Sequence, residues 1–112
     1  FLKLFLNIKG DIDNLGEVIN INIYRIIQEG MNNALKHSKA SKISINLSVI
    51  KKDLVLEFSD NGVGFNTKIL KNSKQFGLVG IKERVQSLRG TFEIQSSRLD
   101  GTKLTIIIPG RL

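Results

Sequence analysis

The strongest constraint on the fold is the alternation of apolar and polar residues in the segment Lys42–Ile50, which is unbroken as far as Val49. The aliphatic side chains at every second position are Ile43, Ile45, Leu47 and Val49. This period of two is typical of a β-strand with one buried face. Lys51–Asp53 then form a polar break, after which Leu54, Leu56 and Phe58 repeat the alternation. The two stretches therefore predict a hairpin.

Two further strands are predicted near the carboxyl end, at Thr91–Ser96 and at Thr102–Ile108, because apolar residues again fall at every second position. Asp100 and Gly101 are typical turn residues and lie between them. Pro109 has no N–H to donate to a strand ladder, so the last strand is expected to stop before it.

Two helices are expected between these strands. From about Asn14 to His37 the chain has no proline, and its aliphatic residues recur at helical spacing, with Asp13 or Asn14 as the expected amino-terminal cap. A second helix is predicted from about Val79 to Arg89, with Gly90 as its carboxyl-terminal cap.

The complete order of elements indicates an α+β protein. Leu2–Ile8 is expected to form a first, shorter strand, and Asn66–Phe76 has no apolar period and is interpreted as a loop. The resulting order of strand, helix, hairpin, loop, helix and hairpin favours a two-layer sandwich of a mixed sheet with its helices on one face. A chain of 112 residues, 41% of them hydrophobic, is long enough for one domain, which we expect to span residues 1–112.

Composition excludes several classes of function. The absence of cysteine rules out disulfides and thiolate metal sites, and a single histidine leaves few ways to build a catalytic triad. No apolar run approaches the roughly 18 residues that span a bilayer, so we expect a soluble chain. The formal charge of +7 is compatible with nucleic acid, but the basic residues are scattered, which favours a dispersed solvated surface.

Polar residues on the first helix are one candidate site. Glu29, Asn33 and His37 are four residues apart and climb one side of the helix, so they can face a common ligand. A solvated polar stripe is the simpler interpretation. Asn33 carries a carbonyl oxygen suited to a hard cation, and Gly30 in mid-helix indicates that another group packs closely there.

Glycine-containing segments are the other candidates. The sequence DNGVGF, residues 60–65, follows a strand, and its carboxylate can accept a hydrogen bond from an amine while its glycines admit a planar ligand. A tight turn explains the same residues. Gly77 and Gly80 precede the second helix, whose free amides favour phosphate oxygens, although a plain loop-to-helix junction is equally compatible. Gly101 and Thr102 alone indicate no more than a hairpin turn.

Taken in order, four segments resemble the nucleotide-binding motifs of histidine kinase catalytic domains, in the superfamily that also includes gyrase and MutL ATPases. These segments are YRIIQEGMNNALKH, SDNGVGF, FGLVGIKERVQSLRG and GTKLTIIIP. The resemblance covers about Ile23 to Pro109 and is nearest to kinases related to nitrate sensors. It implies the Bergerat ATP-binding fold with a mixed five-stranded sheet.

The resemblance also implies a role for each residue of the site. Asn33 would ligate Mg²⁺, and Glu29 would polarise or position groups near the phosphates. Asp60 would bind the amino group of adenine, and Thr102 would support the adenine site through Asp60 or a water. The other residues expected to contact ATP are Lys36, His37, Gly62, Gly64, Phe65, Gly77, Leu78 and Gly80.

The implied function is transfer of the γ-phosphoryl group of ATP to a histidine on a separate dimerisation and phosphoacceptor domain, with a response regulator downstream. The only histidine, His37, lies inside a nucleotide motif, so the phosphoacceptor histidine is expected on another segment. We expect this domain to be cytoplasmic, in a parent protein that can be anchored in the inner membrane. Two alternatives stay open: a regulatory ATP-binding module or serine kinase of the anti-sigma-factor type, and a nucleic-acid-binding protein without enzymatic activity.

Overall fold

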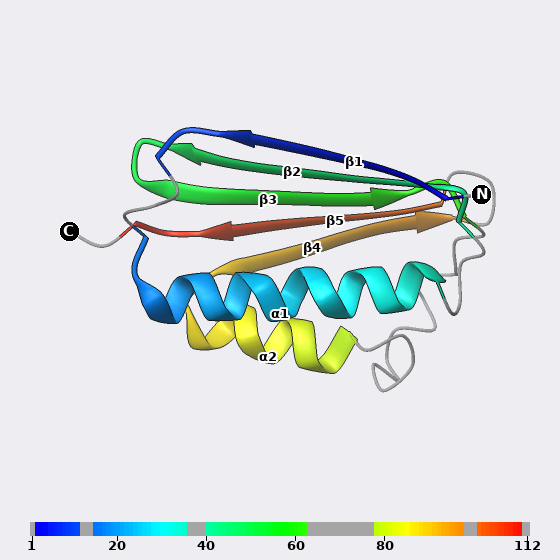
Figure 1. The fold of residues 1–112 in the computed structure, drawn as a ribbon. Helices are drawn as coiled ribbons and strands as arrows, with labels where there is room; N and C mark the ends of the chain where they lie inside the picture. The colour runs from blue at the N-terminus through cyan, green and yellow to red at the C-terminus, as the bar shows by residue number, and fades with distance from the viewer. Residues whose placement is uncertain (1, 12–14, 36–39, 63–77, 98–100, 111–112) are drawn as a thin grey trace.

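The computed structural model describes residues 2–11, 15–35, 40–62, 78–97 and 101–110. A five-stranded sheet is covered on one side by two helices that lie side by side (Figure 1). The elements in chain order are β1 (Lys3–Lys9), α1 (Glu17–Asn33), β2 (Lys42–Ile50), β3 (Asp53–Asp60), α2 (Leu78–Ser87), β4 (Thr91–Ser97) and β5 (Gly101–Ile108). The α+β class, the element order and the five-stranded sheet expected from the sequence are confirmed.

The sheet is mixed, with strand order β1-β2-β3-β5-β4. The edge strand β1 runs parallel to β2, and the other three pairs of strands are antiparallel. Lys51 and Lys52 join β2 to β3 with φ values of 50° and 73°, the left-handed backbone that a two-residue hairpin turn requires. Asp53 belongs to β3, so the polar break between the strands is one residue shorter than the sequence indicated.

The core lies between the sheet and the two helices. Ile45 pairs with Phe58 across β2 and β3, and Phe58 pairs with Leu104 across β3 and β5, so the alternating apolar residues meet on one face. The buried apolar side chains are Ile19, Ile23, Ile26, Ala34, Ile43, Ile45, Leu47, Leu54, Leu56, Phe58, Ile81, Val85, Leu88, Leu104, Ile106 and Ile108. Each large side chain among them stabilises the fold by about 1.5–3 kcal/mol through burial.

Helix α1 begins later than the sequence pattern suggested. Its first residue is Glu17 and its cap is Gly16, which has φ of 89° and makes no side-chain capping bond. The expected cap at Asp13 or Asn14 is therefore wrong. A left-handed backbone at Gly16 turns the chain into the helix, and only glycine adopts such a φ without strain.

Helix α2 ends in a Schellman motif, a carboxyl-terminal cap closed by two main-chain hydrogen bonds. The N–H of Gly90 donates to the carbonyl of Val85 at 2.9 Å, and that of Arg89 donates to Gln86 at 3.0 Å. The left-handed residue is Arg89, with φ of 58°, and Gly90, the predicted cap, follows it and closes the motif with its N–H. Gly90 is needed for a different reason, because a Cβ there would lie 2.7 Å from the carbonyl oxygen of Ile107 on β5.

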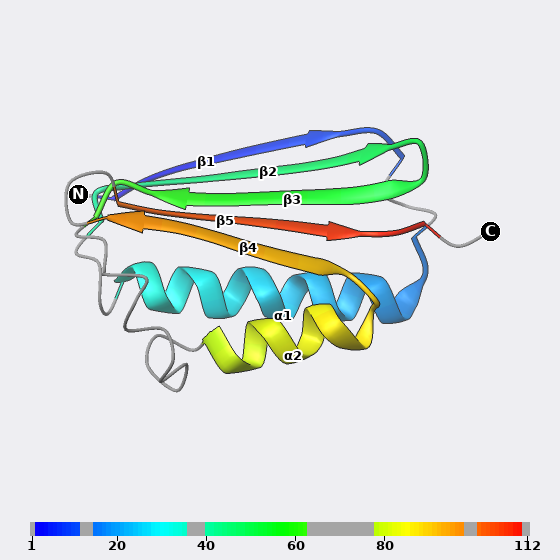
Figure 2. The same ribbon diagram turned by 180° about the vertical axis from the view of Figure 1, so that it is seen from behind.

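The two ends of the molecule differ in what they bring together. The carboxyl-terminal end of α1, the start of α2, the end of β3 and the start of β5 all lie at one end of the sheet (Figures 1 and 2). The β2–β3 turn and the start of α1 lie at the other. Within the described residues, no helix combines the length and apolar character needed to cross a membrane.

Candidate functional site

Asp60 is the carboxylate at the end of β3. It follows Leu54, Leu56 and Phe58 in phase, so its side chain belongs to the helix-covered face. The N–H of Gly62 donates to Oδ1 of Asp60 at 2.9 Å. Burial raises the pKa of Asp60 above its ordinary value of 3.8, and main-chain hydrogen bonds from Gly62 and Thr102 oppose that rise. The result is a half-buried carboxylate with its acceptor atoms held in place by the backbone.

Gly101 brings the start of β5 against the backbone of Asp60. Its φ is 80°, and a Cβ at this position would collide with the carbonyl oxygen of Asp60. Only glycine fits both the backbone angle and the space. Thr102 follows, pairs with Asp60 across the two strands, and shares the same face of the sheet. The predicted adenine-site residues Asp60, Gly62 and Thr102 are thus gathered at one point.

Asn61 fixes the chain immediately after Asp60. Its Oδ1 accepts hydrogen bonds from the N–H groups of Ser41, at 3.0 Å, and Lys42, at 2.8 Å. Its Nδ2 donates to Oγ of Ser41 at 3.0 Å. The sequence identified Asn61 only as a turn residue. Its actual contacts join the end of β3 to the start of β2 and hold the turn that carries Gly62.

Glu29 and Gly80 form a second group, where α1 meets α2. A Cβ on Gly80 would lie 2.7 Å from Oε2 of Glu29, so the absence of a side chain makes room for the carboxylate. Oε1 of Glu29 lies 3.4 Å from Nε of Arg84 one turn further along α2. Arg84 also donates from Nη1 to Oδ1 of Asn22 at 3.4 Å. Oε2 of Glu29 is buried and has no hydrogen-bond partner among the described residues.

The two groups are connected through Gly30 and Phe58. A Cβ on Gly30 would lie 3.2 Å from the ring of Phe58, two residues before Asp60. The close packing expected at this mid-helix glycine is confirmed, and the neighbour is an aromatic ring. Because Glu29 and Asn33 flank this contact on α1, the polar residues of the helix lie at the same end of the sheet as Asp60.

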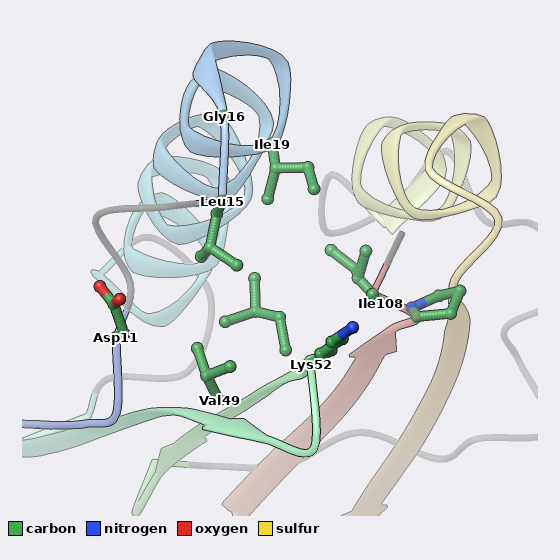
Figure 3. A pocket seen from close by; sticks show the side chains of 10 residues that line it. Asp11, Leu15, Gly16, Ile19, Val49, Lys52 and Ile108 are labelled. Atoms are coloured by element: carbon green, nitrogen blue, oxygen red, sulfur yellow. The ribbon is translucent and has the colours of Figure 1, made fainter. Parts of the chain in front are cut away.

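A cavity of about 430 Å³ lies at this end of the sheet. Its lining residues are Ser59, Asp60, Gln95, Ser96, Gly101, Thr102 and Lys103. A larger cavity, of about 550 Å³, lies at the opposite end, beside the β2–β3 turn (Figure 3). Leu15, Ile19 and Val49 are among its mainly aliphatic walls, and none of the predicted site residues lines it. Of these two cavities, the smaller is therefore the one that predicted site residues line.

Several predicted residues lie outside the part of the chain that the structure describes. These are Lys36, His37, Gly64, Phe65 and Gly77. Asn33 and Leu78 are described as backbone positions, the last residue of α1 and the first of α2. Among the described residues, no three His, Asp or Glu side chains gather as a metal site. Mg²⁺ usually takes only one or two protein oxygens together with substrate phosphates and waters, and such a site needs no cluster of this kind.

Comparison with known families identifies the class of protein. The model of the histidine kinase-, DNA gyrase B- and HSP90-like ATPases matches residues 19–112. The chain belongs to this family. The match includes every segment that carries a predicted nucleotide contact, and it confirms the resemblance inferred from the four motifs.

Individual relatives are sensor histidine kinases. The chain is 46% identical to the sensor histidine kinase ComP of Bacillus subtilis over 89 residues, covering 79% of this chain and 12% of ComP. It is 39% identical to the histidine-protein kinase/phosphatase DegS of the same organism over 97 residues, covering 85% of this chain and 25% of DegS. The chain thus spans a quarter or less of the length of these two relatives.

Solved structures support the fold independently. The histidine kinase domain of a blue-light activated kinase from Erythrobacter litoralis superposes with a TM-score of 0.78 at 21% identity, over 95% of this chain and 54% of that one. The histidine kinase AdeS of Acinetobacter baumannii gives a TM-score of 0.78 at 20% identity, over 99% of this chain and 55% of that one. At these identities the likeness establishes the shared architecture.

Proposed function

We propose that this chain binds Mg-ATP and donates the γ-phosphoryl group to a histidine on a separate phosphoacceptor domain, as the catalytic domain of a sensor histidine kinase. The observation that carries the proposal is the half-buried Asp60 carboxylate, held by Gly62 and Thr102 beside a cavity of about 430 Å³. This arrangement suits an amine at the closed end of a pocket. The relatives named above favour histidine over serine as the acceptor.

Asp60 is assigned to the adenine amino group. An ionised carboxylate is an acceptor alone, and its two main-chain bonds leave further lone pairs for a ligand. Gly62 is assigned to the base by the family motif, because a residue without a side chain lets the backbone approach a planar ligand. Gly64 and Phe65, which follow, are assigned to the base by the family motif.

Asn33 is assigned to Mg²⁺, and Lys36 and His37 to the phosphates. Asn33 is the last residue of α1 and lies one turn beyond Glu29, so the two positions fall on the same side of the helix. When bound, Mg²⁺ would neutralise charge on the phosphates. Leu78 and Gly80 lie at the start of α2, whose free amides would donate to phosphate oxygens. Gly77 is assigned to the phosphates by the family motif.

Glu29 fits a positioning role near the phosphates. Oε2 of its carboxylate is buried without a partner among the described residues, while Oε1 faces Arg84. A buried acceptor of this kind costs about 1–3 kcal/mol if it stays unpaired, so an incoming donor would relieve it. Such a hydrogen-bond donor would arrive with the hydrated metal or with the phosphoacceptor histidine.

The proposal is tested in two steps. Mg-ATP should raise the melting temperature of the chain, because a ligand that binds only the folded state stabilises it. The chain with a histidine-bearing acceptor domain from a relative should then transfer labelled phosphate to histidine, which is identified by its acid lability. Transfer to a serine of a partner would favour the anti-sigma-factor type of kinase. Salt-dependent DNA binding without an ATP effect would contradict both.

A further inference from the structure

Ser96 on β4 makes two hydrogen bonds with the start of β5. Its Oγ lies 2.9 Å from Oγ1 of Thr102 and 3.2 Å from the carbonyl oxygen of Gly101. Ser96 follows Phe92 and Ile94 in phase, and both of these pack against the core. The serine hydroxyl therefore shares the helix-covered face with Thr102, at the same end of the sheet as the Asp60 carboxylate.

The two hydrogen bonds fix the direction of both hydroxyl groups. A hydroxyl has one proton, and the carbonyl of Gly101 can only accept, so the proton of Ser96 goes to that carbonyl. Oγ of Ser96 is then an acceptor in its contact with Thr102, and the hydroxyl of Thr102 donates to it. This is the arrangement in which both bonds form at once. Oγ1 of Thr102 is left with lone pairs and no free proton.

This assignment sets the character of the cavity wall. Asp60, Ser96 and Thr102 all line the cavity of about 430 Å³. The carboxylate of Asp60 has no proton to offer when ionised, and the hydroxyl of Thr102 has committed its own to Ser96. Asp60 and Thr102 together thus present acceptors to a ligand. A base that places an amine against Asp60 and Thr102 can donate hydrogen bonds to them and is bound. A base that places a carbonyl there brings its oxygen against their acceptor oxygens, which is unfavourable.

We propose that Ser96 is a positioning residue that determines base selectivity: by taking the proton of Thr102, it makes the wall select a 6-aminopurine over a 6-oxopurine nucleotide. The inference rests on the proposed function, in which the base lies against Asp60. Ser96 acts through Thr102 and is assigned no contact with the nucleotide.

The test compares ATP with inosine triphosphate, in which a carbonyl replaces the amine. Calorimetric titration of the wild type with each Mg-nucleotide should give about 10- to 100-fold tighter binding of ATP, since unpaired buried acceptors are costly. In Ser96→Ala, the hydroxyl of Thr102 turns its proton toward Asp60 or the ligand. The ratio of the two affinities should then fall by at least about fivefold. Ser96→Thr keeps the hydroxyl and should keep the ratio.

Two further variants separate selectivity from folding. Thr102→Val removes the acceptor and should lower the ratio by itself, and adding Ser96→Ala to it should change the ratio no further. Thermal unfolding without nucleotide identifies any variant that fails to fold. An unchanged ratio in Ser96→Ala or Thr102→Val, with ATP still bound, overturns the inference alone. Equal losses of selectivity in Ser96→Ala and Ser96→Thr also overturn it. A wild type that binds neither nucleotide overturns the proposed function and this inference together.

Discussion

Arg84 on α2 is paired with Glu29 on α1, with Nε 3.4 Å from Oε1. Their side chains are 36% and 29% exposed, so water screens the pair, and its direct contribution to stability is about 1 kcal/mol or less. The main effect of the Arg84–Glu29 pair is to fix the geometry of the two side chains. The pair holds the carboxylate of Glu29 against Gly80, and it links the helix that carries the predicted metal ligand to the helix that follows the predicted phosphate loop.

Gly80→Ala should abolish this pairing with little net change in stability. The new Cβ would lie 2.7 Å from Oε2, so the carboxylate must leave its position. Alanine gains about 1 kcal/mol over glycine within a helix, which offsets the loss. A double-mutant cycle with Glu29→Gln and Arg84→Ala should show coupling in the wild type and none in the Gly80→Ala background. Equal coupling in both backgrounds would mean that Gly80 does not make room for the pair.

Gly30→Ala should destabilise the fold despite the better helix propensity of alanine. The added Cβ would lie 3.2 Å from the ring of Phe58, tighter than an ordinary contact, and overpacking costs about 1–3 kcal/mol against a gain of about 1. Chemical denaturation should give a net loss of up to about 2 kcal/mol. In a Phe58→Leu background the same substitution should be neutral or stabilising. A loss of the same size in both backgrounds would exclude the ring as the cause.

The fold could be predicted from the sequence where a short period dominates. The alternation in β2 predicted Lys42–Ile50 with the observed ends, because one face of that strand is buried along most of its length. The ends of the helices were less accurate. The cap of α1 is Gly16 and not Asn14, and the left-handed residue after α2 is Arg89. Gly90 closely approaches the carbonyl of Ile107 on β5, a contact between distant segments that no local pattern encodes.

Some residues of the candidate site could likewise be predicted from the sequence, and others could not. Asp60, Gly62 and Thr102 were recognisable because they belong to compact motifs, and the structure brings them together. Arg84 and Ser96 were not identified as partners of Glu29 and Thr102. The first pair is separated by 55 residues, and the second is set by the pairing of β4 with β5. The one signal for Ser96 in the sequence was its position, because it continues the every-second-residue pattern of the core residues Phe92 and Ile94.

Asp60 should lower the stability of the ligand-free protein as the pH rises. Its pKa is raised in the folded state by burial, so between 3.8 and the folded value the native state binds more protons than the unfolded state. The free energy of unfolding contributed by this group therefore falls through that window and is constant above it. Asp60→Asn should remove this component, so the free energy of unfolding of the variant should increase relative to that of the wild type as the pH rises through the window. Parallel denaturation curves at every pH would contradict the assigned burial.

Asn33→Ala should remove the Mg²⁺ dependence of nucleotide binding, because the carboxamide is the assigned metal ligand. Nucleotide affinity with Mg²⁺ should approach the affinity measured in a chelator. Asn32→Ala is the matched control, since its neighbouring amide is exposed and has no assigned role. Should the Asn33 variant keep its full response to Mg²⁺, the metal assignment would be wrong.

The central claim is that Asp60 holds the amino group of adenine, and calorimetric titration of Mg-ATP into the wild type and Asp60→Asn tests it most directly. Asparagine keeps the size of the side chain and an oxygen for the Gly62 N–H, but it presents an NH₂ group in place of the second acceptor. We expect ATP to bind about 5- to 150-fold more weakly, equivalent to about 1–3 kcal/mol, with the protein still folded. Wild-type affinity in a folded Asp60→Asn protein would contradict the account.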